Sequence, residues 1–146
     1  MTLYEILKAK GSTVYTVDPE ASLQDVTQEL VRHNVGSLVV CHRDLDCGEQ
    51  LLGIITERDI IRFCASGSAC LTDVRVAAVM TTKVVTGSPS DAVETVMGVM
   101  TTNRIRHLPV ISNGRLVGVI SIGDIVKSQH DQLAMENQFM KNYITG

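Results

Sequence analysis

The sequence has few of the residues on which aromatic cores depend. It contains no tryptophan, and aromatic residues make up only 3% of its 146 residues, whereas hydrophobic residues make up 45%. The core is therefore expected to consist of valine, isoleucine, leucine, methionine and alanine. A chain of this length forms one domain of ordinary size, or two small halves that share a core.

Charge of one sign and long apolar segments are also lacking. The formal net charge is −3 at pH 7, and no five like charges follow one another. This balance gives no long-range attraction to nucleic acid or to an anionic membrane, so neither partner is favoured. The N-terminal residues have no basic region and no signal-peptide core, and no segment approaches the length of a membrane span. We therefore expect a soluble, cytoplasmic protein.

The cysteines lack the spacing of a metal site. Cys41, Cys47, Cys64 and Cys70 include no Cys-x-x-Cys pair, and Cys41 with His42 and Cys47 does not match a usual zinc knuckle. In a cytoplasmic protein they are expected to be free thiols. All four lie in the first half of the chain, so we expect no structural or catalytic metal.

One short pattern is present twice. A glycine, two β-branched residues, a hydroxyl and an acid three places further on occupy residues 53–59 and again residues 118–124, which we call the first and second corner motifs. The β-branched residues favour a buried strand. The hydroxyl is a natural N-cap, with the acid at the third position of the following helix. Each corner motif therefore predicts a strand that leads directly into a helix.

The corner motif has two interpretations. It is an ordinary capping box, in which hydroxyl and acid satisfy the first amides of the helix. Alternatively, the duplicated corner binds a phosphorylated ribose, with amides and hydroxyl at phosphate and the carboxylate accepting from two ribose hydroxyls. The motif alone leaves both interpretations open.

The duplication extends over most of the chain. A shift of 70 residues places Pro19 on Pro89 and Val40 on Val110, whereas a shift of 65 is needed to place Gly53 on Gly118. The five extra residues of the first half fall in the polar segment 41–50. The chain is thus expected to consist of two repeats, residues 1–65 and 71–127, followed by residues 128–146.

Both repeats are predicted to contain the same elements in the same order. These are a lead-in helix, an extended segment, an amphipathic helix, two strands and a closing helix. In the first repeat they are expected at residues 3–10, 12–17, 22–33, 38–40, 51–55 and 56–63, and in the second at residues 73–80, 83–86, 93–100, 108–111, 116–120 and from 121 onward. Asn113 and Gly114 indicate a type I′ hairpin, and residues 65–69 indicate a linker.

The last residues continue after the second repeat is complete. Leu133, Met140 and Ile144 fall near one helical face, with Phe139 and Tyr143 beside it. Such an amphipathic helix packs either on its own domain or on a second subunit, and the sequence leaves this open. The unpaired apolar faces of a lone repeat pair favour a homodimer.

With both repeats in view, residues 3–127 resemble a tandem pair of CBS domains, the regulatory unit also called a Bateman module, of the stand-alone bacterial type. The two corner motifs and the strands and helices upstream of them carry the resemblance, and residues 104–110 are similar to the second half of many bacterial members. The resemblance implies an α+β fold of two β-α-β-β-α repeats, packed sheet to sheet with pseudo-twofold symmetry, plus a C-terminal helix.

The resemblance also implies two clefts that bind adenosine compounds such as AMP, ADP, ATP, NAD(H) or S-adenosylmethionine. In each cleft an aspartate, Asp59 or Asp124, is expected to hold the ribose hydroxyls, and Thr56 or Ser121 to meet phosphate. Adenine is expected against the extended runs and near the start of the strands. The residues implied there are Ser12, Thr13, Val14, Gly36, Ser37, Thr82, Lys83, Val84, Arg106 and His107.

Positive side chains predict which ligands fit. Arg58, Arg104, Arg106 and Lys83 lie on segments that should converge at the clefts, where guanidinium groups bind phosphate well. A solvated surface position is the alternative for each of them. Together they favour a ligand with at least one phosphate and disfavour S-adenosylmethionine. Gly36 stands at the position that corresponds to Arg106, so the two clefts are expected to differ.

The cleft with Asp124 is expected to be occupied in preference to the other, because Gly123 lets a ligand approach the helix backbone closely. In the other cleft Glu57 should repel phosphate, although a neighbouring arginine partly offsets it. The residues expected at the ligand in the preferred cleft are Arg106, Ser121, Ile122, Gly123 and Asp124.

No sequence pattern of a common enzyme is present. We find no nucleophile elbow, no His-Glu-x-x-His and no Gly-x-Gly-x-x-Gly after a strand. The sequence therefore predicts a non-catalytic sensor that binds an adenine nucleotide or dinucleotide, needs no metal and regulates an unknown downstream protein. A protein-interaction module that acts through dimerisation is the alternative.

Overall fold

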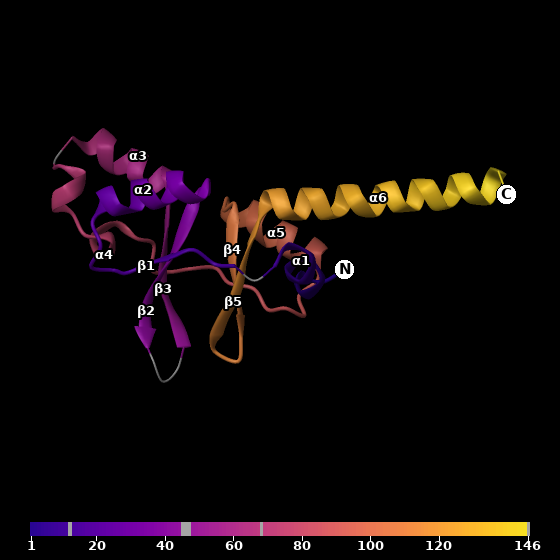
Figure 1. Ribbon diagram of the computed structural model, residues 1–146, viewed down its shortest axis with the longest axis horizontal. Helices are drawn as coiled ribbons and strands as arrows, with labels where there is room; N and C mark the ends of the chain where they lie inside the picture. Colours follow the sequence, from indigo (N-terminus) through magenta and orange to yellow (C-terminus); the bar gives the residue numbers. More distant parts are fainter. Residues whose placement is uncertain (12, 45–47, 68, 146) are drawn as a thin grey trace.

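A computed structural model describes residues 1–11, 13–44, 48–67 and 69–145. Figure 1 shows the two halves of the chain side by side, with the last helix extending beyond the second half. The first half contains α1 (Leu3–Lys10), β1 (Thr16–Val17), α2 (Leu23–His33), β2 (Ser37–Asp44), β3 (Gly48–Thr56) and α3 (Glu57–Ser66). The second contains a 3-10 turn (Leu71–Asp73), α4 (Val76–Val79), α5 (Val93–Asn103), β4 (His107–Ser112), β5 (Arg115–Ser121) and α6 (Ile122–Thr145). This order confirms the predicted α+β class.

The two sheets are built in the same way. In the first half β1 pairs with β2 in parallel and β2 pairs with β3 antiparallel, so that Ser37 lies opposite Thr56. In the second half β4 and β5 pair antiparallel, with His107 opposite Ser121. A parallel bridge from Gly87 to Val110 takes the place of β1 there. Because β3 and β5 are in contact, the two sheets meet, as the resemblance to tandem CBS domains implied.

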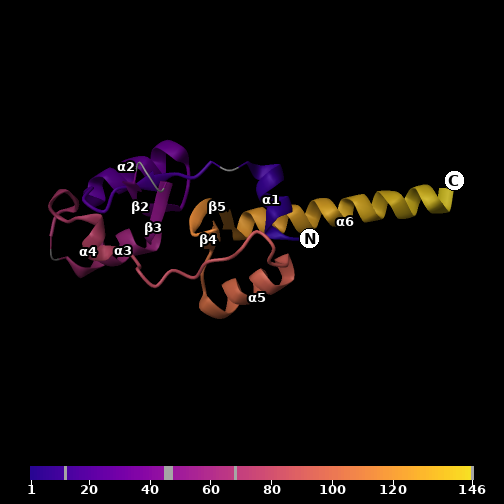
Figure 2. The ribbon, with the colours of Figure 1, turned by 90° about the horizontal axis from the view of Figure 1, so that it is seen from below.

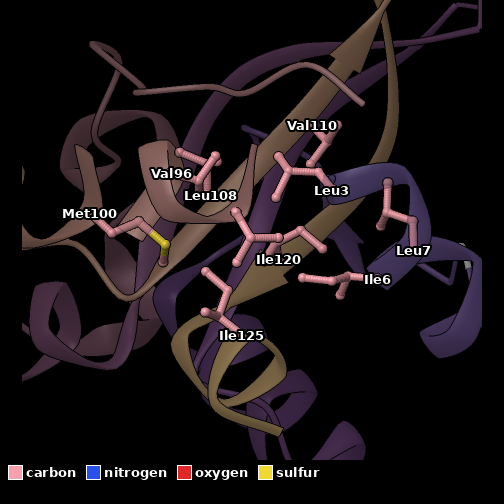
Figure 3. Close-up of a cluster of buried hydrophobic side chains, with 10 residues drawn as sticks. Leu3, Ile6, Leu7, Val96, Met100, Leu108, Val110, Ile120 and Ile125 are labelled. Carbon is pink, nitrogen blue, oxygen red and sulfur yellow. The ribbon is translucent and has the colours of Figure 1, made fainter. Parts of the chain in front are cut away.

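Each lead-in helix packs on the opposite half of the chain. The buried side chains of α1, including Leu3 and Leu7, join the core of the second half, where Figure 3 shows them facing Ile120 and Val110. In return Val76 of α4 joins the core of the first half. Figures 1 and 2 both show α1 beside α6 in the second half of the molecule, and α4 on the side of the first half. The boundary predicted at residue 65 therefore does not separate two independent cores.

The two halves thus exchange their lead-in helices, and matching backbone hydrogen bonds hold each helix on the opposite half. Each lead-in helix donates two N–H groups to carbonyl oxygens in the turn that precedes the amphipathic helix of the opposite half. These bonds run from Leu3 to Asp91 (3.0 Å), from Tyr4 to Pro89 (2.9 Å), from Val76 to Ala21 (2.8 Å) and from Ala77 to Pro19 (3.0 Å). The four acceptors correspond in pairs under the shift of 70 residues, so the two halves are related by a pseudo-twofold exchange.

The exchange of lead-in helices also explains why each corner motif begins with a glycine. A Cβ atom at Gly118 would lie 2.5 Å from Cδ2 of Leu7 on α1. At Gly53 it would lie 2.7 Å from the carbonyl oxygen of Thr81 and 2.9 Å from Sδ of Met80, just after α4. All three distances are shorter than van der Waals contact. Glycine therefore leaves room where the opposite lead-in segment crosses the strand, against a side chain at Gly118 and against the backbone at Gly53.

The closing helix of the second repeat and the predicted tail are one continuous helix. The 24 residues of α6 extend for about 36 Å at 1.5 Å per residue. Only its first part contacts the body of the protein, where Ile125 is buried. Figure 2 shows the remainder projecting past α1. The structure thus contains no break at residue 128, where the sequence predicted the start of a separate segment.

Several elements differ in length from those that the sequence predicted. The first extended segment has strand structure only at Thr16–Val17, and Ser12 lies outside the described residues. The lead-in helix expected over residues 73–80 is shortened to the 3-10 turn and α4. Residues 65 and 66 of the predicted linker belong to α3. Asn113 and Gly114 have φ angles of 51° and 76°, as a type I′ hairpin requires.

The described part of the chain contains no helix with the length and apolar character of a membrane span. Its histidine, cysteine, aspartate and glutamate side chains form no group of three or more that could hold a metal ion. Cys41 is buried, Cys64 and Cys70 are exposed, and Cys47 lies outside the described residues. The absence of a bound metal stays a prediction.

Candidate functional site

A cavity of about 680 Å³ lies where the first corner motif meets the second half of the chain. Its walls come from segments 56–62, 81–85 and 103–107, together with Gly36 and Ile54. Sites for small molecules enclose roughly 300–1,000 Å³. We call it the Asp59 cavity, and its size and its position between two halves suit a ligand of nucleotide size.

Asp59 and Thr56 form the capping box that the sequence predicted. The Thr56 N–H donates to Oδ2 of Asp59 at 2.9 Å, and the Asp59 N–H donates to Oγ1 of Thr56 at 3.3 Å. The Thr56 hydroxyl also donates to Oδ2, at 3.2 Å. Among the described residues no hydrogen bond reaches Oδ1 of Asp59. The cap therefore uses one carboxylate oxygen, and the other is left for a ligand that donates hydroxyl groups.

Positive side chains dominate the cavity walls. Five lysine or arginine residues line it, against only two carboxylates, those of Glu57 and Asp59. The five are solvent-exposed, and within the described ranges none of them forms an ion pair. They are Arg58, Arg62, Lys83, Arg104 and Arg106. In a chain of net charge −3 such a concentration favours an anionic ligand.

Arg104 holds its position at a conformational cost. It follows α5 with φ 54°, in the left-handed region, as Asn34 does after α2 with φ 53°. Asparagine adopts this conformation readily, but for other side chains it costs about 1–2 kcal/mol. Strained residues of this kind concentrate at functional sites. The turn directs residues 104–107 along the cavity wall.

In the second corner motif the aspartate is already bound by another side chain of the same protein. The Ser121 N–H donates to Oδ2 of Asp124 at 2.8 Å, and the Asp124 N–H donates to Oγ of Ser121 at 3.1 Å. Unlike in the first motif, a lysine also contacts the carboxylate, because Lys10 Nζ lies 2.5 Å from Oδ2 of Asp124. The same ammonium group donates to the carbonyl oxygen of Val119 at 2.6 Å.

These contacts set the pKa of Asp124. Burial acts to raise the pKa of this carboxyl group, but the hydrogen bonds from Lys10 and Ser121 outweigh it and lower the pKa below 3.8. The unfolded chain therefore binds the proton more readily than the folded chain. The stability that the ionised carboxylate contributes is present above pH 3.8 and is lost as the pH falls through the lowered value.

His107 stands between the two corner motifs. Burial and the charge of Lys10 lower the pKa of its imidazole below 6.5, although Glu57 and Asp124 act to raise it. The neutral form is therefore favoured at pH 7. A Cβ atom at Gly36 would lie 2.7 Å from Oε1 of Glu57, so a side chain at that position would displace the Glu57 carboxylate. Gly36 therefore leaves room for Glu57 at the position where the second half carries Arg106.

The structure brings together about half of the residues predicted for the ligand. Those that line the Asp59 cavity are Gly36, Thr56, Arg58, Asp59, Lys83, Val84, Arg104, Arg106 and His107. Those that are not part of its wall are Thr13, Val14, Ser37, Thr82, Ser121, Ile122, Gly123 and Asp124. Ser12 lies outside the described residues. Arg106, which was expected with Asp124, lies in the wall of the cavity that contains Asp59.

Other wall residues were not anticipated, among them Arg62, Thr81 and Asn103. Arg62 stands four residues after Arg58, and this helical spacing places both on one face of α3. That signal was present in the sequence. Thr81 and Asn103 are positioned by the chain crossing between the halves, for which no local pattern exists.

Comparison with known proteins agrees with this architecture. A profile of the CBS domain matches residues 11–66 and 76–131. The chain belongs to the CBS-domain family and carries two such domains in tandem, which confirms the resemblance seen in the sequence. It is also similar to the CBS domain-containing protein CBSX3, mitochondrial, from Arabidopsis thaliana, with 35% identity over 153 residues that cover 99% of this chain and 72% of that protein.

Solved structures share the fold. The CBS-domain containing protein ATU1752 from Agrobacterium tumefaciens is 38% identical with a TM-score of 0.80, over 88% of this chain and 99% of that chain. The CBS domain protein PAE2072 from Pyrobaculum aerophilum, solved in complex with AMP, is 28% identical with a TM-score of 0.74, over 85% of this chain and 89% of that chain.

Proposed function

We propose that the protein is a non-catalytic, cytoplasmic sensor that binds an adenine nucleotide or dinucleotide and signals its presence to a partner protein. The observation that carries the proposal is the Asp59 cavity, in which five unpaired cations surround a carboxylate with one uncommitted oxygen. The related protein PAE2072 was solved with AMP, which supports an adenosine ligand. The proposed site is the cavity at Asp59, although the sequence had favoured the cleft at Asp124.

Each part of such a ligand has a counterpart in the cavity. Oδ1 of Asp59 would accept hydrogen bonds from the ribose hydroxyls. Arg58, Arg104 and Arg106 would meet the phosphates, because guanidinium groups form paired, charge-assisted hydrogen bonds with phosphate oxygens. The base would lie against the extended segment 81–85, whose Val84 and Val85 supply apolar surface. S-adenosylmethionine, which has no phosphate, fits this charge distribution less well.

The direct test is calorimetric titration with AMP, ADP, ATP and NAD(H), accompanied by thermal unfolding. We expect at least one of them to bind and to raise the melting temperature, because a ligand at 100 times its Kd stabilises the native state by about 2.7 kcal/mol. S-adenosylmethionine serves as the control that lacks phosphate. If no adenosine compound binds, the alternative of a protein-interaction module takes precedence.

We further propose that the projecting part of α6, residues 130–145, mediates homodimerisation. Leu133, Met135, Phe139, Met140, Tyr143 and Ile144 are between 55% and 78% exposed. At 100° per residue all six fall on one half of the helix surface. The segment carries few charges of both signs, so two copies can pair along it without strong repulsion. The partner that fits this surface is a second copy of the same helix.

Adding charge to the apolar half of this segment should weaken the dimer. We expect Phe139→Glu with Met140→Glu to shift the mass measured by light scattering at tens of micromolar toward the monomer, as deletion of residues 128–146 should. The matched control is Asn137→Glu with Gln138→Glu, which adds the same charge on the polar half and should leave the mass unchanged. A truncated chain that dimerises as well as the full chain would rule out this role.

A further inference from the structure

We propose that Lys10 permanently occupies the acid of the second corner motif, so that each chain binds one nucleotide, at Asp59, and never two. This inference rests on the proposed nucleotide-binding function of the Asp59 cavity. It concerns the difference between two positions that the repeat makes equivalent, since Asp59 and Asp124 correspond under the shift of 65 residues.

The contact is formed by the last turn of α1. Lys10 Nζ lies 2.5 Å from Oδ2 of Asp124 and 2.6 Å from the carbonyl oxygen of Val119. The side chains of Lys10 and Asp124 are only 34% and 23% exposed. The ammonium group therefore sits on the carboxylate that a ribose in this cleft would need.

The lead-in helices explain why only one half has this contact. In the first half the Thr81 N–H donates to the carbonyl oxygen of Ile54 at 2.9 Å, and the Ile54 N–H returns the bond at 3.0 Å. Val119 is the counterpart of Ile54. Because α1 has eight residues and α4 only four, the second half receives the Lys10 ammonium group where the first half receives a backbone amide.

A ribose is a weak competitor for this carboxylate. Its hydroxyls are neutral donors, whereas Lys10 carries a full positive charge, whose Coulomb attraction to the carboxylate adds to the hydrogen bond. Displacement would also leave an ammonium group partly buried and without its carboxylate. At Asp59 no cation has to be removed, because among the described residues its carboxylate accepts hydrogen bonds from Thr56 alone and forms no ion pair.

The second corner motif also has fewer positive side chains at the corresponding positions. Of the five cavity cations only Arg62 has a cationic counterpart, Lys127. Arg58, Arg104 and Arg106 correspond to Gly123, Asn34 and Gly36. The Asp59 cavity therefore combines an uncommitted carboxylate oxygen with the larger number of cations.

Stoichiometry decides the inference. Whichever of AMP, ADP, ATP and NAD binds the wild-type chain most tightly is titrated into wild-type, Lys10→Met and Lys8→Met proteins. We expect one equivalent in all three, with affinities within twofold of one another. Two equivalents in the wild type, or a tenfold weaker affinity of Lys10→Met, would overturn the inference, because Lys10 would then share its site with a ligand or contact one.

The ion pair itself has a separate readout. Methionine keeps the helix propensity of lysine but removes the charge. We expect Lys10→Met to lower the melting temperature by about 2–4 °C, as the loss of a partly buried pair does in a chain of this size. Lys8→Met, at an exposed position on the same turn of α1, should leave it unchanged. Equal melting temperatures for the two variants would also overturn the inference. If no nucleotide binds the wild type, the proposed function fails, and the melting comparison still tests the Lys10 contact.

Discussion

Asp59→Ala should weaken nucleotide binding by more than tenfold and leave the protein folded. The substitution removes the acceptor proposed for two ribose hydroxyls. Hydrogen bonds to a charged group are each worth roughly 1.5–3 kcal/mol, and about 1.4 kcal/mol corresponds to a factor of ten. The loss of the two hydrogen bonds that the Asp59 carboxylate accepts from Thr56 should lower the free energy of unfolding by only about 1 kcal/mol. Calorimetry and urea denaturation measure the two effects separately.

The chain contains a matched control for this variant. Ser22 and Asp25 form the same capping box at the start of α2, with both reciprocal hydrogen bonds present. Asp25 is exposed and does not line the Asp59 cavity. We expect Asp25→Ala to cost a similar amount of stability without any change in affinity. If both variants bind the nucleotide as the wild type does, Asp59 is a helix cap and nothing more.

Gly53→Ala should destabilise the fold by about 1–3 kcal/mol, the usual cost of overpacking a core. The added methyl group would lie 2.7 Å from the Thr81 carbonyl oxygen. That oxygen belongs to the backbone and accepts a hydrogen bond from the Ile54 N–H, so it cannot move without breaking the bridge between the two segments. Urea denaturation should show a lower midpoint with an unchanged slope.

Gly118→Ala is the corresponding variant in the second half, and it should cost clearly less. Its methyl group would meet Cδ2 of Leu7, the end of a flexible side chain that can change rotamer. The gain from restricting the unfolded chain, about 0.4–1 kcal/mol, offsets part of the cost. Equal losses for the two alanine variants would contradict the distinction between a backbone and a side-chain obstacle.

The regular elements could be predicted from the sequence because their signals are local. Periodic apolar positions, the capping residues and the Asn113–Gly114 pair each depend on neighbours within a few residues. The repeat supplied the order of the elements in both halves. What the sequence could not supply is which half each lead-in helix covers, because Leu3 has the same apolar character whichever core it joins.

The site was predicted in part for the same reason. Thr56 and Asp59 form a local pattern, and their capping box is present as expected. The choice between the clefts depends on Lys10, which lies 114 residues from Asp124 along the chain and reaches it only because α1 is longer than α4. No sequence window contains both partners. Glu57, which was expected to make the first cleft unfavourable, is outnumbered by cations that only the folded chain brings together.

The exchange of lead-in helices constrains how a nascent chain can acquire its structure. The first repeat lacks Val76 until that residue has been synthesised, while Leu3 and Leu7 of α1 have no core to join before Ile120 and Ile125 have followed. Neither half can therefore mature alone as it leaves the ribosome. Contacts between residues this distant in sequence form slowly. Folding is expected to be completed in one step only after the second repeat has been synthesised, and α1 remains without its core until then.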